Sequence, residues 1–136
     1  MTKTIKVYEA VLAYNTIKNI IEIDTLNRIS PAFKFKLLMI LHNALTPIYK
    51  EYEYTRQNLI KENGVETKNE NGEVIGMQIP ENSDTEQKFK NDMKAVQEND
   101  VEINFTPITF EELFSVGLDV DNCETLLIIA DEYKGE

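Results

Sequence analysis

The sequence predicts a mainly helical α+β protein with a long kinked central helix, a small β-hairpin and one further strand. Two long stretches carry apolar residues at intervals of three and four, which places these residues on one face of a helix. Further along, an Asn-Gly turn separates two short segments that favour strands, and a later segment alternates apolar and polar residues. Helices therefore come first and dominate, while the strands are few and short.

The order of these signals predicts a single domain over residues 1–136. We expect an N-terminal helix and connector at residues 1–29, the long helix at residues 30–63 and the hairpin at residues 64–82. A helix, a strand and two further helices are expected at residues 83–136. The hydrophobic fraction of 42% is ordinary for a globular protein and too high for a disordered one.

The long helix has clear signals at both ends and one in the middle. Ser30 is a typical N-cap, and Pro31 suits the first helical position because the missing N–H has no partner there in any case. Gly64 is a typical C-terminal stop. Pro47 lies midway, lacks an N–H, and its ring crowds the carbonyl of Asn43, which predicts a kink.

The second half of the chain contains the strands and the shorter helices. Asn71-Gly72 is a hairpin turn between residues 65–68 and 73–75. A two-stranded ribbon is marginal in water, so it must pack on a helix or on a partner. Ser83 and Thr109 each open a capping box, which predicts a helix start, and the segment 101–105 alternates as a half-buried strand does.

The charge is unevenly distributed. The net charge is −10; residues 1–50 hold seven basic and three acidic residues, whereas residues 51–136 hold seven basic and 21 acidic ones. An excess of negative charge argues against DNA or an anionic membrane as the main partner. A plain solvated acidic surface is the alternative to any functional interpretation of this charge.

No arrangement of residues that catalysis or metal binding requires is found. The single histidine, His42, falls within the long helix, where a structural role is the simplest interpretation. Cys123 lies among acidic residues that disfavour a reactive thiolate, and we interpret it as a packing residue. One His and one Cys cannot form a zinc site, and no phosphate-binding or dinucleotide-binding motif is present. We therefore expect a non-enzymatic protein without a cofactor.

The sequence also suggests a compartment. A single cysteine forms no internal disulfide, which fits a reducing environment. The N-terminal residues do not run into an apolar segment, and no stretch approaches the ~20 apolar residues that span a bilayer. We expect a location in the cytoplasm, with incorporation into a larger assembly as an alternative.

Three tyrosines and an arginine are concentrated in the second half of the long helix: Tyr49, Tyr52, Tyr54 and Arg56. Tyr and Arg dominate protein interfaces because they combine a large contact area with a polar group. The sequence therefore marks these four residues as a candidate interaction site. The alternative is that Tyr52 belongs to the core and the other two tyrosines lie at its boundary.

Several segments between residues 30 and 133 resemble a family of short uncharacterised proteins encoded by tailed bacteriophages and prophages of low-GC bacteria. They are Pro-Ala-Phe-Lys-Phe-Lys-Leu at residues 31–37, Tyr-Glu-Tyr-Thr-Arg-Gln-Asn-Leu-Ile at residues 52–60, the Asn-Gly turn, Glu-Gln-Lys-Phe at residues 86–89, and Asp-Val-Glu-Ile at residues 100–103. The first 25 residues depart from the family by an extra helix. The resemblance implies a phage protein made in the bacterial host cytoplasm, and it implies no activity or site residue.

Two functions fit these observations best, and a host-type regulatory domain with an unknown ligand is a third, weaker alternative. The first is a phage-type protein–protein interaction module, either a small virion or tail component or an assembly factor, which binds a phage structural protein or a second copy of itself. The alternative is an acidic inhibitor of a host nucleic-acid-acting defence enzyme, in which carboxylates replace the phosphates of the nucleic acid. Neither function involves direct contact with nucleic acid or a membrane.

Overall fold

The computed structural model describes residues 2–23, 29–118 and 120–130. It confirms a mainly helical α+β protein with a long helix and two small antiparallel sheets. Within the span that the sequence predicts as a single domain, the chain divides into two compact units. The first is Met1–Tyr49 with Asp100–Glu136, and the second is Lys50–Asn99. The connector at residues 24–28 and the C-terminal tyrosine lie outside the described residues.

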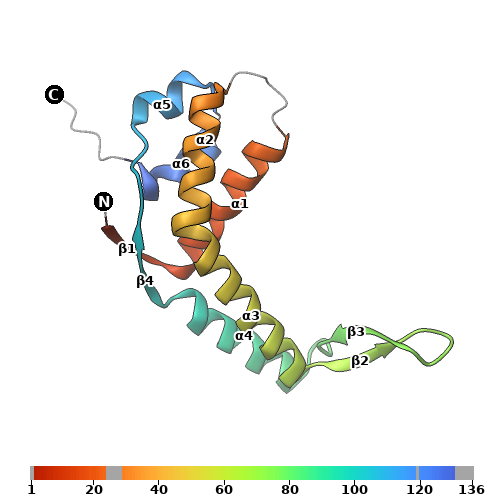
Figure 1. Ribbon diagram of the computed structural model, residues 1–136. Coiled ribbons are helices and arrows are strands. Elements are labelled where there is room, and N and C mark those ends of the chain that lie inside the picture. Colours follow the sequence, from red (N-terminus) through yellow and green to blue (C-terminus); the bar gives the residue numbers. More distant parts are fainter. Residues whose placement is uncertain (1, 24–28, 119, 131–136) are drawn as a thin grey trace. The chain divides into compact units, whose positions relative to one another are not determined.

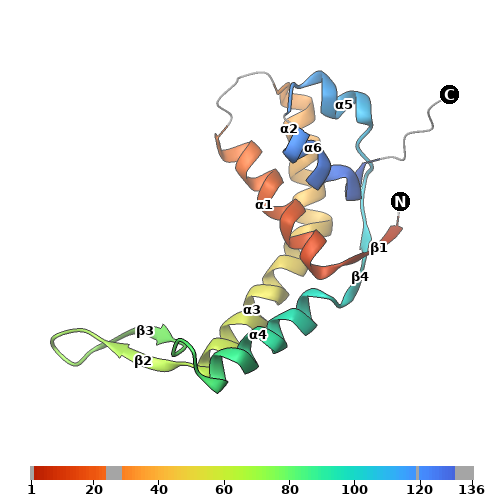
Figure 2. The same ribbon diagram turned by 180° about the vertical axis from the view of Figure 1, so that it is seen from behind.

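The first unit is a group of helices with a two-stranded sheet (Figures 1 and 2). Its elements are β1 (Thr2–Lys6), α1 (Val7–Ile23), α2 (Pro31–Ile40), the π-helical turn η1 (Leu41–Leu45), the start of α3 (Thr46–Asn63), β4 (Asp100–Asn104), α5 (Phe110–Ser115), α6 (Val120–Leu126) and the 3₁₀ turn η2 (Leu127–Ile129). Helix α1 packs against α2, η1 and α6, so it lies at the centre of this unit.

The sheet of the first unit corrects one prediction. We expected a single further strand at residues 101–105, but β4 pairs antiparallel with a second strand, β1, from Thr2↔Asn104 to Lys6↔Asp100. Ile5 and Ile103 are buried on the same face, and the outer face is polar. The ammonium of Lys6 lies 2.7 Å from the carboxylate of Asp100, which closes the end of the pair.

The core of the first unit is continuous. Nine large apolar side chains have less than 2% of their surface exposed, and all of them belong to this unit: Ile17, Leu37, Ile40, Leu45, Ile103, Ile108, Leu113, Leu126 and Ile129. They come from α1, α2, η1, β4, α5, α6, η2 and the segment before α5, so every layer of the unit contributes. Burial of this kind supplies the main favourable term in folding.

The predicted helix starts are confirmed by their hydrogen bonds. The N–H of Phe33 donates to Ser30 Oγ at 3.2 Å, and Pro31 occupies the start of α2. Thr109 forms a complete capping box, because its hydroxyl accepts from the N–H of Glu112 and the Glu112 carboxylate accepts from the N–H of Thr109. Such caps satisfy N–H groups that have no partner inside the helix.

The long helix runs from Pro31 to Asn63 as α2, η1 and α3, in agreement with the predicted residues 30–63. The sequence predicts a kink at Pro47, and the structure has a π-helical turn at Leu41–Leu45, just before the proline. The N–H of Thr46 donates to the carbonyl of Leu41, five residues back, and the Thr46 hydroxyl donates to the same oxygen at 2.7 Å. A π turn widens the helix, which relieves the crowding that the proline ring causes.

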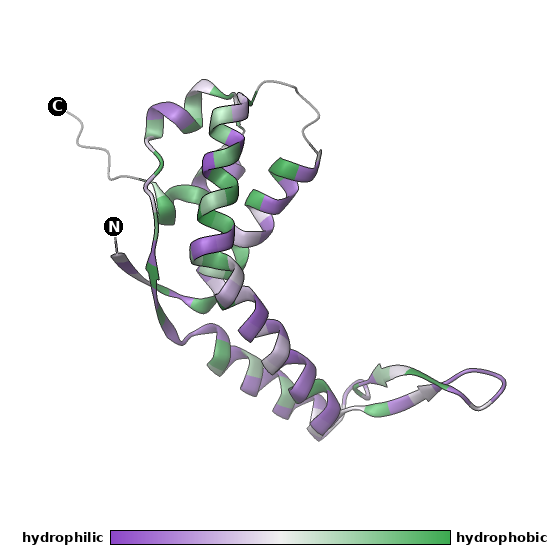
Figure 3. Ribbon diagram, in the orientation of Figure 1, coloured by the Kyte–Doolittle hydropathy of each residue, from purple (hydrophilic) through white to green (hydrophobic). Residues whose placement is uncertain are grey.

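The second unit contains Lys50–Asn63 of α3, the hairpin β2 (Val65–Lys68) and β3 (Val74–Gln78), and α4 (Asp84–Gln97). Ser83 caps α4, since its Oγ accepts from the N–H of Glu86 at 3.1 Å. Met93 is the one buried apolar side chain between Lys50 and Asn99, a range that the structure describes completely. Figure 3 shows the same contrast, with hydrophobic colour predominating on α2 and hydrophilic colour on α3 and α4.

Candidate protein-interaction surface

The β2–β3 hairpin is organised by the side chain of Asn69. Its Oδ1 accepts hydrogen bonds from the N–H groups of Asn71 and Glu73, both at 3.0 Å. The N–H of Asn69 donates to the carbonyl of Glu73 at 2.9 Å, and the N–H of Gly72 donates back to Asn69. Gly72 has a φ of 82°, a conformation that favours glycine. The turn is therefore fixed by local sequence, as the Asn-Gly signal predicts.

The two strands pair with one irregularity. Val65 lies opposite Gln78, Thr67 lies opposite Gly76, and Lys68 lies opposite Val74, so Ile75 has no residue opposite it. This extra residue is a β-bulge, which increases the local twist of a strand and directs side chains differently from a regular ladder.

The base of the hairpin is held tightly. The N–H of Gly64 donates to the carbonyl of Ile60 at 2.7 Å, and the buried side chain of Asn63 donates to the carbonyl of Leu59 at 2.9 Å. A Cβ atom on Gly64 would lie 2.5 Å from Ile60 O and 3.3 Å from Gln78 O. At Gly64, where the hairpin follows α3, the backbone atoms of Ile60 and Gln78 are so close that a side chain cannot be added without a shift of the chain.

Three apolar side chains of the hairpin remain in contact with solvent. Val65 is 55% exposed, Val74 is 54% exposed and Ile75 is 64% exposed. We refer to these three residues as the hairpin surface; it includes both faces of the ribbon, because Val65 lies on the same face as its partner Gln78 and Ile75 lies on the other face. The sequence predicts that the ribbon packs either on a helix or on a partner, and these exposures show that the described residues of the chain leave the hairpin surface uncovered.

The two strands differ in charge. Strand β2 carries Glu66 and Lys68, whereas no charged residue occurs from Val74 to Pro80. Elsewhere between Lys50 and Asn99 no uncharged run exceeds four residues. Charged residues on an outer strand discourage pairing with other chains, and their absence permits it. We refer to the outward backbone edge of Val74–Gln78 as the β3 edge.

The charges of α4 are balanced along the helix. Lys88 lies 2.8 Å from Asp92, and Lys90 lies 3.0 Å from Glu86, each pair one helical turn apart. The hydrogen bond from Lys88 to Asp92 raises the pKa of the Lys88 ammonium above its usual value. Alternating charges in paired positions are typical of a solvated helix face.

The four residues predicted as an interaction site have different environments. Tyr49 stacks on Tyr14 within the first unit, with ring centroids 4.0 Å apart and an interplanar angle of 5°. In the second unit, the side chain of Gln97 donates to the Tyr52 hydroxyl at 3.4 Å. Arg56 lies 3.6 Å from Glu53 on the same helix. Tyr49, Tyr52 and Arg56 thus have partners within the chain.

Tyr54 is the most exposed of the four predicted residues, at 65%. At 3.6 residues per turn it points about 160° away from Tyr52 around the helix. The structure therefore does not bring the four side chains together into one patch. Within this set, Tyr54 is the residue whose ring is available for a partner.

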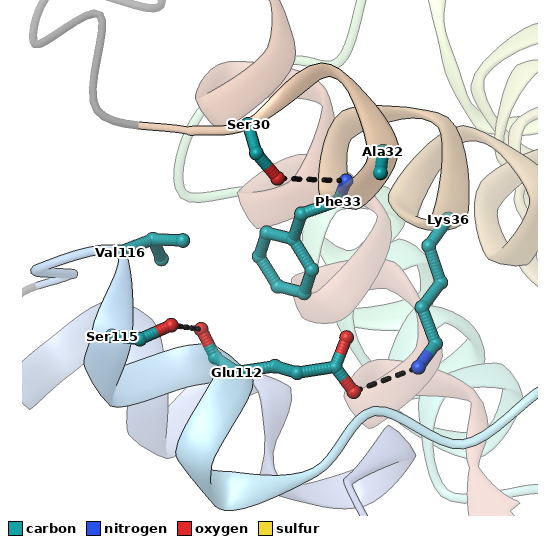
Figure 4. A pocket seen from close by; sticks show the side chains of 7 residues that line it. All are labelled: Ser30, Ala32, Phe33, Lys36, Glu112, Ser115 and Val116. Carbon is teal, nitrogen blue, oxygen red and sulfur yellow. Dashed lines mark hydrogen bonds and ion pairs between the residues drawn. The ribbon is translucent and has the colours of Figure 1, made fainter.

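The first unit has a pocket of about 280 Å³ between α2 and α5 (Figure 4). The ammonium of Lys36 donates to a carboxylate oxygen of Glu112 at 2.7 Å across it, and the ring of Phe33 lies beside this ion pair. The hydrogen bond from Lys36 lowers the pKa of the Glu112 carboxyl below its ordinary value. Glu112 also completes the cap of α5. We therefore assign a structural role to the Lys36–Glu112 ion pair, which joins α2 and α5.

His42 and Cys123 lie apart from the hairpin. His42 is exposed on η1, and Cys123 is buried in the core of the first unit. Within residues 2–23, 29–118 and 120–130, no group of three metal-binding side chains comes together. Across the same residues, no helix combines the length and the apolar character that a bilayer crossing requires.

Comparisons with protein-family models, curated proteins and solved structures give no match to this chain. The resemblance to the phage family stays a prediction that rests on the segments between residues 30 and 133.

The interaction site predicted from the sequence consists of three tyrosines and Arg56, and it does not include Val74 or Ile75. A usable signal was present. The uncharged run from Val74 to Pro80 stands out in a segment where charged residues are otherwise closely spaced.

Proposed function

We propose that this chain is a non-enzymatic protein–protein interaction module of a phage, a small virion or tail component or an assembly factor, that binds its partner through the second unit. The hairpin surface is the observation that carries the proposal, since Val65, Val74 and Ile75 are each more than half exposed. The resemblance to phage-encoded proteins supports the phage context.

The energetic argument starts from the apolar area. Burying the exposed part of three β-branched side chains is worth roughly 3 kcal/mol in total, from about 1.5–3 kcal/mol per fully buried side chain. A two-stranded ribbon alone is marginal in water. A partner that covers the hairpin surface therefore stabilises the ribbon as well as the complex. Tyr54 adds an exposed aromatic ring on the same unit.

The alternative of an acidic inhibitor gains no support from α4. Asp92 and Glu86 are ion-paired with lysines of the same helix, so α4 presents alternating charge and not a continuous row of carboxylates. Affinity measured between 0.05 and 0.5 M salt separates the two functions. Binding by charge mimicry weakens steeply as the Debye length shrinks, whereas apolar burial responds little.

The proposal is tested in bacteria that carry the phage, with tagged protein at its native level, chemical crosslinking and mass spectrometry. We expect one dominant partner, crosslinked through Lys68 on β2. Changing Val74→Asp and Ile75→Asp together should reduce its capture at least tenfold while the circular dichroism spectrum is unchanged.

The matched control changes Phe35→Asp and Met39→Asp on α2, which are 64% and 42% exposed in the first unit. This variant removes as many exposed apolar side chains and adds the same charge, and it should retain the partner. Equal capture by wild type and the hairpin variant, or loss confined to the α2 variant, would contradict the proposal.

A further inference from the structure

The two edges of the hairpin differ in charge: the β2 edge carries charged residues, whereas the β3 edge carries none and contains the bulge at Ile75. Glu66 and Lys68 lie on β2, and natural proteins use such charges to keep a free strand from pairing with other chains. Strand β3 has no charged residue, and a Cβ atom on its central Gly76 would meet nothing within 4 Å. The hairpin thus has one edge with charged side chains and one without.

The sequence of β3 is compatible with pairing to itself. In an antiparallel arrangement centred on Gly76, Val74 lies opposite Gln78 of the second copy, and Ile75 lies opposite Met77. All five residues of the strand are then paired, and no like charges face one another across the junction. The nearest carboxylate on the turn side, Glu73, accepts a hydrogen bond from the Asn69 side chain at 3.3 Å.

We propose that β3 pairs antiparallel with β3 of a second copy of this chain, which gives a four-stranded sheet in the order β2-β3-β3-β2. This inference rests on the proposed function and names the partner of the β3 edge. Four strands exceed the minimum that makes a sheet stable, which a lone hairpin does not reach. The outer edges of the new sheet are the two β2 strands, whose charged side chains disfavour the addition of further strands to the symmetric dimer.

The size of the contact sets the expected affinity. A single pair of five-residue strands is smaller than the standard stable interface of ~800 Å² per partner. We therefore expect a dissociation constant on the order of 10–100 μM, with monomer at low concentration and dimer at high concentration.

The experiment is sedimentation equilibrium of the full chain from 5 to 500 μM. The wild type should pass from monomer to dimer over this range. Ile75→Lys places a charge on the β3 edge and should raise the dissociation constant at least tenfold. Val65→Lys places the same charge on a comparably exposed residue of β2, outside the new junction, and should change it less than threefold.

A mixing experiment tests the register. In the proposed pairing the two copies of position 75 are diagonal neighbours, within reach of long side chains. Ile75→Lys and Ile75→Glu should each associate weakly alone, and an equimolar mixture should recover most of the wild-type association. The hairpin fold of each variant is checked by the NMR signals of Gly72 and Gly76.

A wild type that stays monomeric at 500 μM overturns the second copy as partner. Association that is unaffected by Ile75→Lys, or lost equally with Val65→Lys, overturns the β3 edge as the junction. These failures are distinct from failure of the proposed function. A monomer that still captures another protein through the hairpin surface leaves that function intact and identifies a different partner.

Discussion

The two units of this chain differ in how completely they bury their apolar side chains. The first unit encloses nine large side chains almost completely, drawn from helices and strands distant in the sequence. The second unit encloses Met93 and leaves Val65, Val74, Ile75 and Tyr54 largely in solvent. Its structure is held instead by local hydrogen bonds: the Asn69 turn, the Gly64 contact and the Ser83 cap.

This difference has a consequence for stability and for function. Regions with few buried apolar contacts open at lower free energy than the core of the same protein. A segment that is ordered by local bonds and keeps apolar side chains exposed is suited to gaining its remaining burial from a partner. The first unit therefore contains the core that stabilises the fold, and the second unit is the one that we propose binds a partner.

The largest effect is expected in the core of the first unit. Leu113→Ala removes a fully buried side chain and should cost roughly 2–5 kcal/mol of unfolding free energy, because the surrounding helices cannot close the cavity. Met93→Ala in the second unit should cost about 1–2 kcal/mol of unfolding free energy. Fewer buried side chains surround Met93, and they can move into the cavity more easily. Hydrogen exchange of both variants, read residue by residue, measures this. Equal losses in both units would remove the distinction.

A smaller effect is expected at the base of the hairpin. Gly64→Ala places a Cβ atom 2.5 Å from a backbone oxygen, so the chain must shift, and we expect a loss of about 1–3 kcal/mol in the local stability of the hairpin. Gly76→Ala is the control within the same hairpin, because a Cβ atom there meets nothing within 4 Å. It should leave stability unchanged or raise it by up to ~1 kcal/mol. Hydrogen exchange of the β2 and β3 amides would show the contrast.

The smallest effect is pH-dependent and belongs to the first unit. The hydrogen bond from Lys36 holds the pKa of the Glu112 carboxyl below its ordinary value of 4.5. A lowered carboxyl pKa stabilises the fold above the unfolded-state pKa, and this stability is lost as the pH falls through the folded-state value. Glu112→Gln should therefore cost about 1 kcal/mol at pH 7 and much less near pH 3. Glu111→Gln is the neighbouring exposed control, and denaturant titrations at both pH values decide the outcome.

Much of the fold follows from local signals in the sequence. Ser30, Thr109 and the Asn-Gly turn each act through hydrogen bonds to residues a few positions away, so their structures were predictable. Strand β1 was not, because Thr2–Lys6 contains one buried residue, Ile5, and is a strand only through pairing with β4 about a hundred residues later. Pairing between distant segments leaves little trace in a short polar stretch.

The candidate site was predicted less well than the fold. Tyr49 was marked from its residue type, yet its stacking on Tyr14 depends on how α1 packs in the first unit. Tyr52 and Tyr54 are two positions apart, so they point to nearly opposite sides of the helix. This separation follows from the sequence spacing alone. The exposure of Val74 and Ile75 depends on which residues the rest of the chain covers, and the uncharged run from Val74 to Pro80 was the one local signal for this site.

The π turn at Leu41–Leu45 affects how mutations are tolerated in this segment. A π turn holds one residue more than a turn of α-helix with the same flanking segments. His42 and Asn43 are exposed, and their side chains can vary with little effect on packing. Deletion of either residue would return the segment to regular α-helical spacing, in which the ring of Pro47 crowds the carbonyl four positions earlier. In this stretch the number of residues is constrained far more tightly than their identity.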